Sequence, residues 1–197
     1  MQVFKKILRC LCLFIYLPLL GCATAMKPIP LVANVDLPKF MGDWYVIAAI
    51  PTAIEKEVYN GIENYKLNAD GTIATTFTFY KGAFDGPLKK YEPKGYVQKE
   101  GNNALWGMQF IWPIKAEYRI TYLDDQYQRT IIARNARDYV WIMARTPQIS
   151  EAEYKEMTDL VAGYGYDMTK LRKVPQSWGT ADSVSNLKHL EKQQNKD

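Results

Sequence analysis

Gly42-Asp43-Trp44-Tyr45 opens an apolar stretch that continues as Val46-Ile47-Ala48-Ala49-Ile50. Its β-branched and aromatic residues predict a strand over 44–52. Seven further runs of this kind follow, over 59–67, 72–80, 91–98, 104–112, 117–123, 127–134 and 139–145. Turn-forming residues separate them, for example Asn68-Ala69-Asp70-Gly71. The sequence therefore predicts an all-β fold, an eight-stranded antiparallel up-and-down β-barrel with no exposed edge.

One α-helix is predicted after the last strand. Ser150 and Glu153 have the spacing of a capping box, and either Gly163 or Gly165 would end the helix. Apolar residues recur between them at helical spacing: Tyr154, Met157, Leu160, Val161 and Tyr164. We expect this helix to lie against the outside of the barrel. The stretch from Tyr166 to Leu171 is predicted to add a short outer strand.

The first 21 residues are predicted to be a signal peptide. Lys5, Lys6 and Arg9 form a positive start, and the apolar run over 10–20 is too short to span a membrane. The run ends in Leu19-Leu20-Gly21-Cys22, which resembles the bacterial lipobox. That resemblance implies cleavage before Cys22 and attachment of lipid to its thiol. The alternative is an ordinary secretory signal cut near Ala23 or Ala25.

Processing at Cys22 has consequences for the rest of the chain. Cys10 and Cys12 leave with the leader, so no thiol remains for a disulfide. Residues 22–35 are predicted to be the acylated cysteine and an extended tether, 36–178 the barrel domain and 179–197 a polar tail. Two or more fatty chains anchor a protein stably in a bilayer. In enteric-type bacteria, an Asp directly after the lipidated cysteine resembles a signal for retention in the inner membrane. Residue 23 is Ala instead, which favours the outer membrane.

Composition argues against several classes of function. The whole chain has 25 basic and 21 acidic residues. Removal of the leader takes away three basic residues, so the two signs then nearly balance. Nothing therefore predicts a nucleic-acid partner. The single histidine, His189, lies in the predicted tail, so no Ser–His pair is expected in the core. We predict no catalytic residues, no metal site and no cofactor.

Three separated motifs resemble those of the lipocalin family, most closely the bacterial outer-membrane lipocalins. They are Gly42-Asp43-Trp44, the block Tyr118 to Tyr127 and the block Asp138 to Pro147. The resemblance extends over 35–178. It implies that Gly42, Trp44 and Arg145 close the bottom of the barrel. A guanidinium over an indole face is a favourable contact, so these residues are expected to be structural.

Strand alternation, counted from the inward Trp44, predicts which side chains face a ligand cavity. The expected cavity residues are Val46, Ala48, Ile50, Tyr65, Phe77, Phe79, Trp106, Met108, Phe110, Trp112, Tyr118, Ile120 and Trp141. Glu63 and Tyr65 are expected to add polarity near the mouth. Lys94 and Lys115 are candidate partners for an acidic headgroup there, or solvated rim lysines.

These predictions converge on a non-catalytic binding protein. We expect it to hold or transport an amphipathic lipid, a fatty acid or a lysophospholipid, for maintenance of the envelope or under stress. We expect it on the outer membrane, facing the periplasm and anchored to the bilayer through Cys22. The alternatives are a scaffold or adhesion barrel with a filled interior and a barrel that binds haem or another pigment. The sequence does not predict an oligomeric state.

Overall fold

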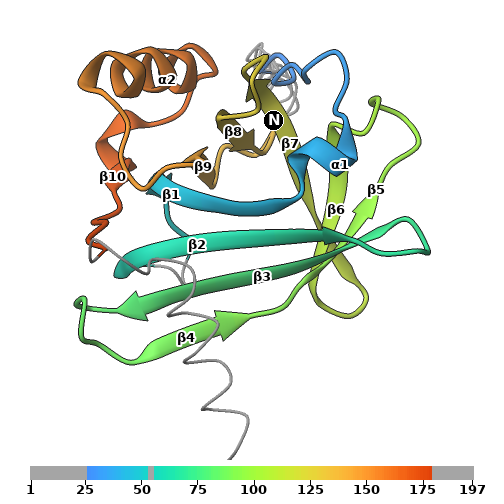
Figure 1. Cartoon of the computed structure of the whole chain (residues 1–197). Helices are drawn as coiled ribbons and strands as arrows, with labels where there is room; N and C mark the ends of the chain where they lie inside the picture. Colours follow the sequence, from blue (N-terminus) through green and yellow to red (C-terminus); the bar gives the residue numbers. More distant parts are fainter. Residues whose placement is uncertain (1–25, 53–55, 179–197) are drawn as a thin grey trace, which may run out of the picture.

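A computed structural model describes residues 26–52 and 56–178 (Figure 1). Its strands are β1 Gly42–Ile50, β2 Val58–Leu67, β3 Thr72–Lys81, β4 Leu88–Tyr91, β5 Lys94–Val97, β6 Leu105–Ile111, β7 Ile114–Leu123, β8 Arg129–Ala133, β9 Val140–Ala144 and β10 Arg172–Lys173. Its helices are α1 Leu37–Phe40, α2 Glu151–Gly163 and the short 3₁₀ helix η1 Met168–Lys170. The predicted signal peptide, Cys22 and the predicted polar tail lie outside the described residues.

The strands form the predicted eight-stranded antiparallel barrel. They follow one another from β1 to β9, and β1 closes the barrel by pairing with β9, from Tyr45 opposite Ala144 to Ile50 opposite Val140. The fourth stave of the barrel consists of two short strands, because β4 and β5 both pair with β3. Pro93 lies between them and has no N–H to donate to a ladder, so the predicted strand over 91–98 is interrupted there.

A β-bulge in β1 reverses the inward and outward faces of that strand. Val46 lies opposite Met143 and Ala48 lies opposite Ile142, so Ile47 is an extra residue. Trp44 and Val46 point into the barrel, but beyond the bulge Ala49 takes the inward position. Ala48 and Ile50 belong to the outer cluster beneath α2. The prediction that Ala48 and Ile50 face the cavity is therefore wrong, because simple alternation cannot anticipate a bulge.

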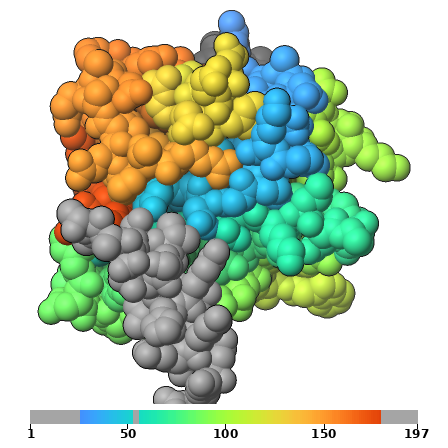
Figure 2. Space-filling model, viewed as in Figure 1, coloured from blue at the N-terminus to red at the C-terminus, as the bar shows by residue number. Residues whose placement is uncertain are grey.

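The turn between β6 and β7 projects beyond the neighbouring strands. Pairing between β5 and β6 ends with Lys94 opposite Gln109, and the register of β6 and β7 shifts after Met108. The side chains of Phe110 and Trp112 are therefore 45% and 82% exposed instead of facing the cavity as predicted. Figure 1 shows this hairpin as the yellow-green turn at the bottom, and Figure 2 shows it at the lower right of the molecular surface.

Helix α2 covers one outer face of the barrel, as predicted. The side chain of Ser150 accepts a hydrogen bond from the Glu153 amide and the Glu153 carboxylate accepts one from the Ser150 amide, which completes the capping box. Met157 and Val161 are the buried residues of α2 and pack on the outer cluster of β1, β8 and β9. The predicted outer strand over 166–171 is wrong, because Met168–Lys170 form η1 and the strand β10 begins at Arg172.

The C-terminal segment Val174–Ser177, here called the strap, lies between β1 and β2. Among the described residues, pairing of β1 with β2 ends at Tyr45 opposite Ile62. Beyond that point the Val174 amide donates to the Ile47 carbonyl, and the Asn60 amide donates to the Pro175 carbonyl. Figure 1 shows the red segment after β10 running past the end of β1 toward the start of β2. The strap thus completes the barrel wall, which the sequence did not predict.

The N-terminal segment lies along the barrel instead of hanging free. Ile29 and Val35 are almost fully buried. The Arg119 guanidinium donates to the Ile29 carbonyl at 2.7 Å, and the Val32 amide donates to the Ile120 carbonyl at 3.0 Å. The prediction of an extended tether over 22–35 is therefore wrong for residues 29–35. Among the described residues, no helix has the length and apolar character needed to cross a membrane.

Candidate ligand-binding site

Trp44 and Arg145 close one end of the barrel. The Arg145 guanidinium carbon lies 3.8 Å from the centre of the Trp44 ring. The guanidinium also donates to five backbone carbonyls, at 3.3 Å to that of Tyr127 and at 2.7 to 3.0 Å to those of Lys39, Phe40, Met41 and Asp43. Burial lowers the pKa of Arg145 to about 10, and it stays charged at neutral pH. Together these contacts form the closed end that the sequence motifs implied.

Two neighbouring features allow this arrangement. Gly42 has a φ of +93°, which disfavours any residue with a Cβ, and a Cβ there would lie 3.5 Å from the Arg145 guanidinium. Helix α1 supplies the Phe40 and Lys39 carbonyls that Arg145 binds. Helix α1 was not predicted from the sequence. Its signal was Asp36, whose side chain caps the helix by accepting from the Lys39 amide, followed by Pro38 in the first turn.

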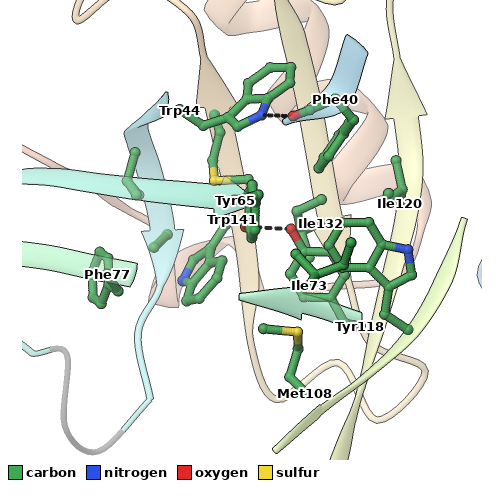
Figure 3. Close-up of a cluster of buried hydrophobic side chains, with 14 of the residues drawn as sticks. Phe40, Trp44, Tyr65, Ile73, Phe77, Met108, Tyr118, Ile120, Ile132 and Trp141 are labelled. Atoms are coloured by element: carbon green, nitrogen blue, oxygen red, sulfur yellow. Dashed lines mark hydrogen bonds between the residues drawn. The ribbon is translucent and has the colours of Figure 1, made fainter. Parts of the chain in front are cut away.

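Above this floor lies a layer of packed aromatic rings. Phe40 contacts Trp44, Tyr65 and Trp106 with ring centres 5.0 to 5.6 Å apart. Trp106 stacks on Tyr118 at 5.0 Å, and the Tyr65 and Tyr118 hydroxyls share a 2.6 Å hydrogen bond (Figure 3). Burial raises the pKa of both tyrosines well above the ordinary value. This half of the barrel interior is solid, and every polar group named here has a partner.

The other half of the interior contains a cavity of about 260 Å³. Its apolar wall is formed by Val46, Ala49, Val58, Phe77, Trp141, Val174 and Pro175. Figure 3 shows Phe77 and Trp141 at a different level of the barrel from Trp44 and Phe40. The cavity therefore has an aromatic and aliphatic lining at the end of the barrel away from the Trp44–Arg145 floor.

The predicted cavity residues fall into three groups. Val46, Phe77 and Trp141 line the cavity itself. The second group belongs to the buried interior of the barrel without lining that cavity: Tyr65, Phe79, Trp106, Met108, Tyr118 and Ile120. The third group lies outside the barrel interior, as described above. It consists of Ala48 and Ile50 of β1 and of Phe110 and Trp112 at the β6–β7 hairpin.

Charged residues surround the cavity at its polar side. Lys56, Glu57, Arg172 and Lys173 all contribute to its lining. Lys173 binds Glu151 at 3.0 Å and lies 4.2 Å from the centre of the Tyr154 ring. With Glu151 included, three basic residues stand against two acidic ones, which leaves this side of the cavity with a net positive charge. Such an arrangement can hold an anionic group beside an apolar tail.

The basic residues expected at the mouth lie elsewhere. Lys94 binds Asp70 at 3.3 Å, in the turn between β2 and β3. Lys115 stacks over Tyr96, with its ammonium 3.6 Å from the ring centre. Glu63 is 1% exposed, within the wall of the barrel. The headgroup assignment of Lys94 and Lys115 is therefore wrong, because neither residue lines the cavity.

Several residues that line the cavity were not predicted from the sequence. Ala49 was missed because the bulge at Ile47 was invisible in the alternation. Val174 and Pro175 were missed because nothing in a short segment after a helix signals that it will enter the barrel wall. Lys56 and Glu57 carry a usable signal, since they precede the second strand and loops between strands border barrel mouths. Among the described residues, no group of three acidic, His or Cys side chains could hold a metal.

Comparison with known proteins agrees with this geometry. Residues 35–176 match the family model of the lipocalin-like domain. The chain is 32% identical to the temperature-induced lipocalin-1 of Arabidopsis thaliana, covering 78% of this chain and 86% of that protein. It is 29% identical to the outer membrane lipoprotein Blc of Escherichia coli K12, covering 81% and 97%.

Solved structures agree on the fold. Insecticyanin from the tobacco hornworm Manduca sexta superposes with a TM-score of 0.58, at 15% identity, over 79% of this chain and 86% of that one. The barrel, the Trp44–Arg145 floor and the family match converge on one assignment. This chain belongs to the lipocalin family, whose members carry small hydrophobic ligands and are not enzymes.

Proposed function

We propose that this protein binds a single-chain amphipathic lipid, a fatty acid or a lysophospholipid, with its tail in the cavity and its headgroup at the charged side. The observation that carries the proposal is the cavity itself, an apolar space of about 260 Å³ bordered by Lys56, Arg172 and Lys173. Burial of each methylene of the tail contributes about 0.8 kcal/mol. A long tail therefore supplies affinity without many polar contacts.

The size of the cavity favours one acyl chain over two. Pockets for small ligands usually occupy about 300 to 1,000 Å³, so this cavity, at about 260 Å³, is slightly smaller than that range. A two-chain phospholipid would need more of the interior, and the aromatic layer of Phe40, Tyr65 and Trp106 already fills the floor. The same layer argues against a large planar pigment.

The proposed ligand class is tested with lipids that differ in one property at a time. We expect hexadecanoic acid and a lysophospholipid to quench the fluorescence of Trp141, which lines the cavity. A two-chain phospholipid should fail to compete. Hexadecanol, which has the same tail without the charge, should bind more weakly than the acid. The proposal is wrong if the purified protein binds none of these single-chain lipids.

The contribution of the charged border has its own control. Arg172→Gln should weaken binding of the acid and leave binding of hexadecanol unchanged, because only the acid presents an anion. Lys155, which is exposed on α2 away from the cavity and pairs with Asp159 at 2.6 Å, provides the matched control variant Lys155→Gln. Equal weakening of the acid and the alcohol by Arg172→Gln would show that the residue acts on folding.

We also propose that the protein is anchored to the outer membrane, facing the periplasm, through lipid on Cys22, for envelope maintenance or stress. Support comes from the lipobox-like Leu19-Leu20-Gly21-Cys22 and from the similarity to Blc lipoproteins. Cys22→Ser should abolish metabolic labelling with palmitate and release the protein from the membrane fraction. Palmitate labelling that persists in this variant would rule out Cys22 as the attachment site.

A further inference from the structure

We infer that the strap, residues Val174–Ser177, is an opening section of the barrel wall, through which ligand passes sideways between β1 and β2. The passage of ligand rests on the proposed ligand site, whereas the opening of the strap is a property of the fold. It makes Gln176 and Asn60 positioning residues that control exchange of ligand. Neither of them lines the cavity.

The strap fills a gap in the barrel ladder. β1 and β2 pair directly only from Gly42 opposite Tyr65 to Tyr45 opposite Ile62. Further along β1, only Ala48 and Ala49 pair with β10 on this side, opposite Lys173 and Arg172. Without the strap, an open slot would therefore lie between β1 and β2. This slot would adjoin the cavity, since Val46 of β1 and Val58 of β2 both line the cavity.

Side chains hold the strap in place more than a main-chain ladder does. The Gln176 amide nitrogen bridges the two strands by donating to the Val46 carbonyl at 2.8 Å and to the Gly61 carbonyl at 3.1 Å. The Asn60 side chain accepts from the Ser177 amide at 2.7 Å and donates to the Ser177 carbonyl at 2.9 Å. The ladder of β2 with β3 instead pairs residue by residue from Ile62 opposite Thr78 to Leu67 opposite Ile73.

The composition of the strap limits its attachment further. Pro175 has no N–H, so it cannot donate to either neighbouring strand. Trp178 supports the strap from outside, by donating from its indole to Gln176 at 2.7 Å and by contacting the Tyr45 ring at 5.6 Å. Segments with few main-chain bonds open locally at lower free energy than central strands do. The strap is therefore the section of this wall that opens most easily.

The position of the strap connects its opening to the ligand. Val174 is 9% exposed and belongs to the interior cluster, and both Val174 and Pro175 line the cavity. Arg172 and Lys173, immediately before the strap, lie at the charged side where we place the headgroup. Opening the strap would let a lipid slide its tail into the barrel while its headgroup stays at this border. The opposite end offers no such route, because Trp44 and Arg145 seal it.

A reversible covalent lock tests the route. In the full chain carrying Asn60→Cys and Ser177→Cys, oxidation ties the strap to β2. We expect the oxidised form to take up and release hexadecanoic acid about tenfold or more slowly than the reduced form, with little change in equilibrium affinity, because a gate affects both rates alike. The single variant Asn60→Cys controls for oxidation itself. Equal rates before and after oxidation would overturn the inference.

A second variant should move the rates in the opposite direction. Gln176→Ala removes the bridge between Val46 and Gly61, so uptake and release should both become faster by a similar factor. Gln148→Ala is the matched control, because Gln148 lies in the segment between β9 and α2 and far from the strap in sequence. A loss of affinity in Gln176→Ala without faster exchange would show that this residue holds the fold and does not control a gate.

Hydrogen exchange tests the opening without any ligand. The amides of Val174 and Asn60, which donate to Ile47 and Pro175, should exchange at least tenfold faster than amides of the β2–β3 ladder such as Glu63. Exchange of these amides only through global unfolding would overturn the inference, whatever lipid binds. If no lipid binds but the strap amides exchange fast, the ligand proposal fails and the opening section stands.

Discussion

The two halves of the barrel interior differ in how completely they are filled. At the closed end, the Arg145 guanidinium donates to five carbonyls, and the Tyr65 and Tyr118 hydroxyls bond to each other. At the other end, Phe77 and Trp141 border an open cavity, and side chains hold part of the wall. Close packing stabilises a protein, and an unfilled cavity sacrifices some of that stability. One barrel thus combines a stabilising floor with a binding half.

The largest effect is expected from breaking the floor. Trp44→Ala should lower the free energy of unfolding by about 3 to 5 kcal/mol, because it removes a fully buried aromatic side chain. Chemical denaturation measures this loss. Arg145→Ala should also destabilise, and the double variant should lose less than the sum, since the two side chains touch. Strict additivity would show that Trp44 and Arg145 do not support each other.

The next effect separates the cavity from the exposed hairpin. Phe77→Asp should abolish lipid binding, because an unpaired carboxylate in an apolar cavity is costly and brings in water. Phe110→Asp, at a side chain that is 45% exposed, should leave binding and folding nearly unchanged. Fluorescence titration with hexadecanoic acid and circular dichroism test the pair. Loss of binding in Phe110→Asp alone would place β6 in the opposite register.

Alkaline pH should destabilise the folded barrel. Burial raises the pKa of Tyr65 and Tyr118 well above its ordinary value, and raises that of Tyr166 to about 12. In the folded state these groups keep protons that the unfolded chain loses above about pH 10, so their contribution to stability is full below that pH and falls as the pH rises. The lowered pKa of Arg145 acts in the opposite direction over the same range, but one arginine offsets only part of the effect of three tyrosines. Melting temperatures measured from pH 8 to pH 12 test this. A flat profile above pH 10 would contradict the buried assignment.

Removal of the shared tyrosine hydrogen bond should cost less than loss of Trp44. Tyr65→Phe should destabilise by about 1 to 2 kcal/mol, because it leaves the Tyr118 hydroxyl buried without its partner. Tyr65→Phe with Tyr118→Phe should cost less than the sum of the two single changes and should flatten the decline above pH 10. Urea denaturation at pH 8 and pH 11 provides both readings.

The smallest effect on stability tests the bulge in β1. Ala49→Leu should fill part of the cavity and weaken lipid binding, with a stability change within about 1 kcal/mol, because the added atoms enter open space. Ala48→Leu points the other way, into the packed cluster beneath α2, and should destabilise by about 1 to 3 kcal/mol without a direct effect on the cavity. The reverse pattern would show that β1 has no bulge.

Sequence reasoning worked where a local pattern and its consequence coincide. Ser150 and Glu153 form the predicted capping box, and the strand runs from 59–67 to 139–145 give barrel staves near their predicted places. It failed where one residue changes the register. The extra Ile47 turns Ala48 and Ile50 outward, and the end of pairing at Gln109 leaves Phe110 and Trp112 in solvent. A slip of one residue exchanges the two faces of a strand.

By itself the sequence determined the fold class, the family and the closed end. These depend on alternation, turn residues and motifs that are local in the chain. Only the tertiary structure decided where the cavity ends, which basic residues border it, and that Val174–Ser177 complete the wall between β1 and β2. Those features depend on contacts between residues more than 100 positions apart, such as Gln176 with Val46. No local pattern records such a contact, because its partners are specified only when the barrel closes.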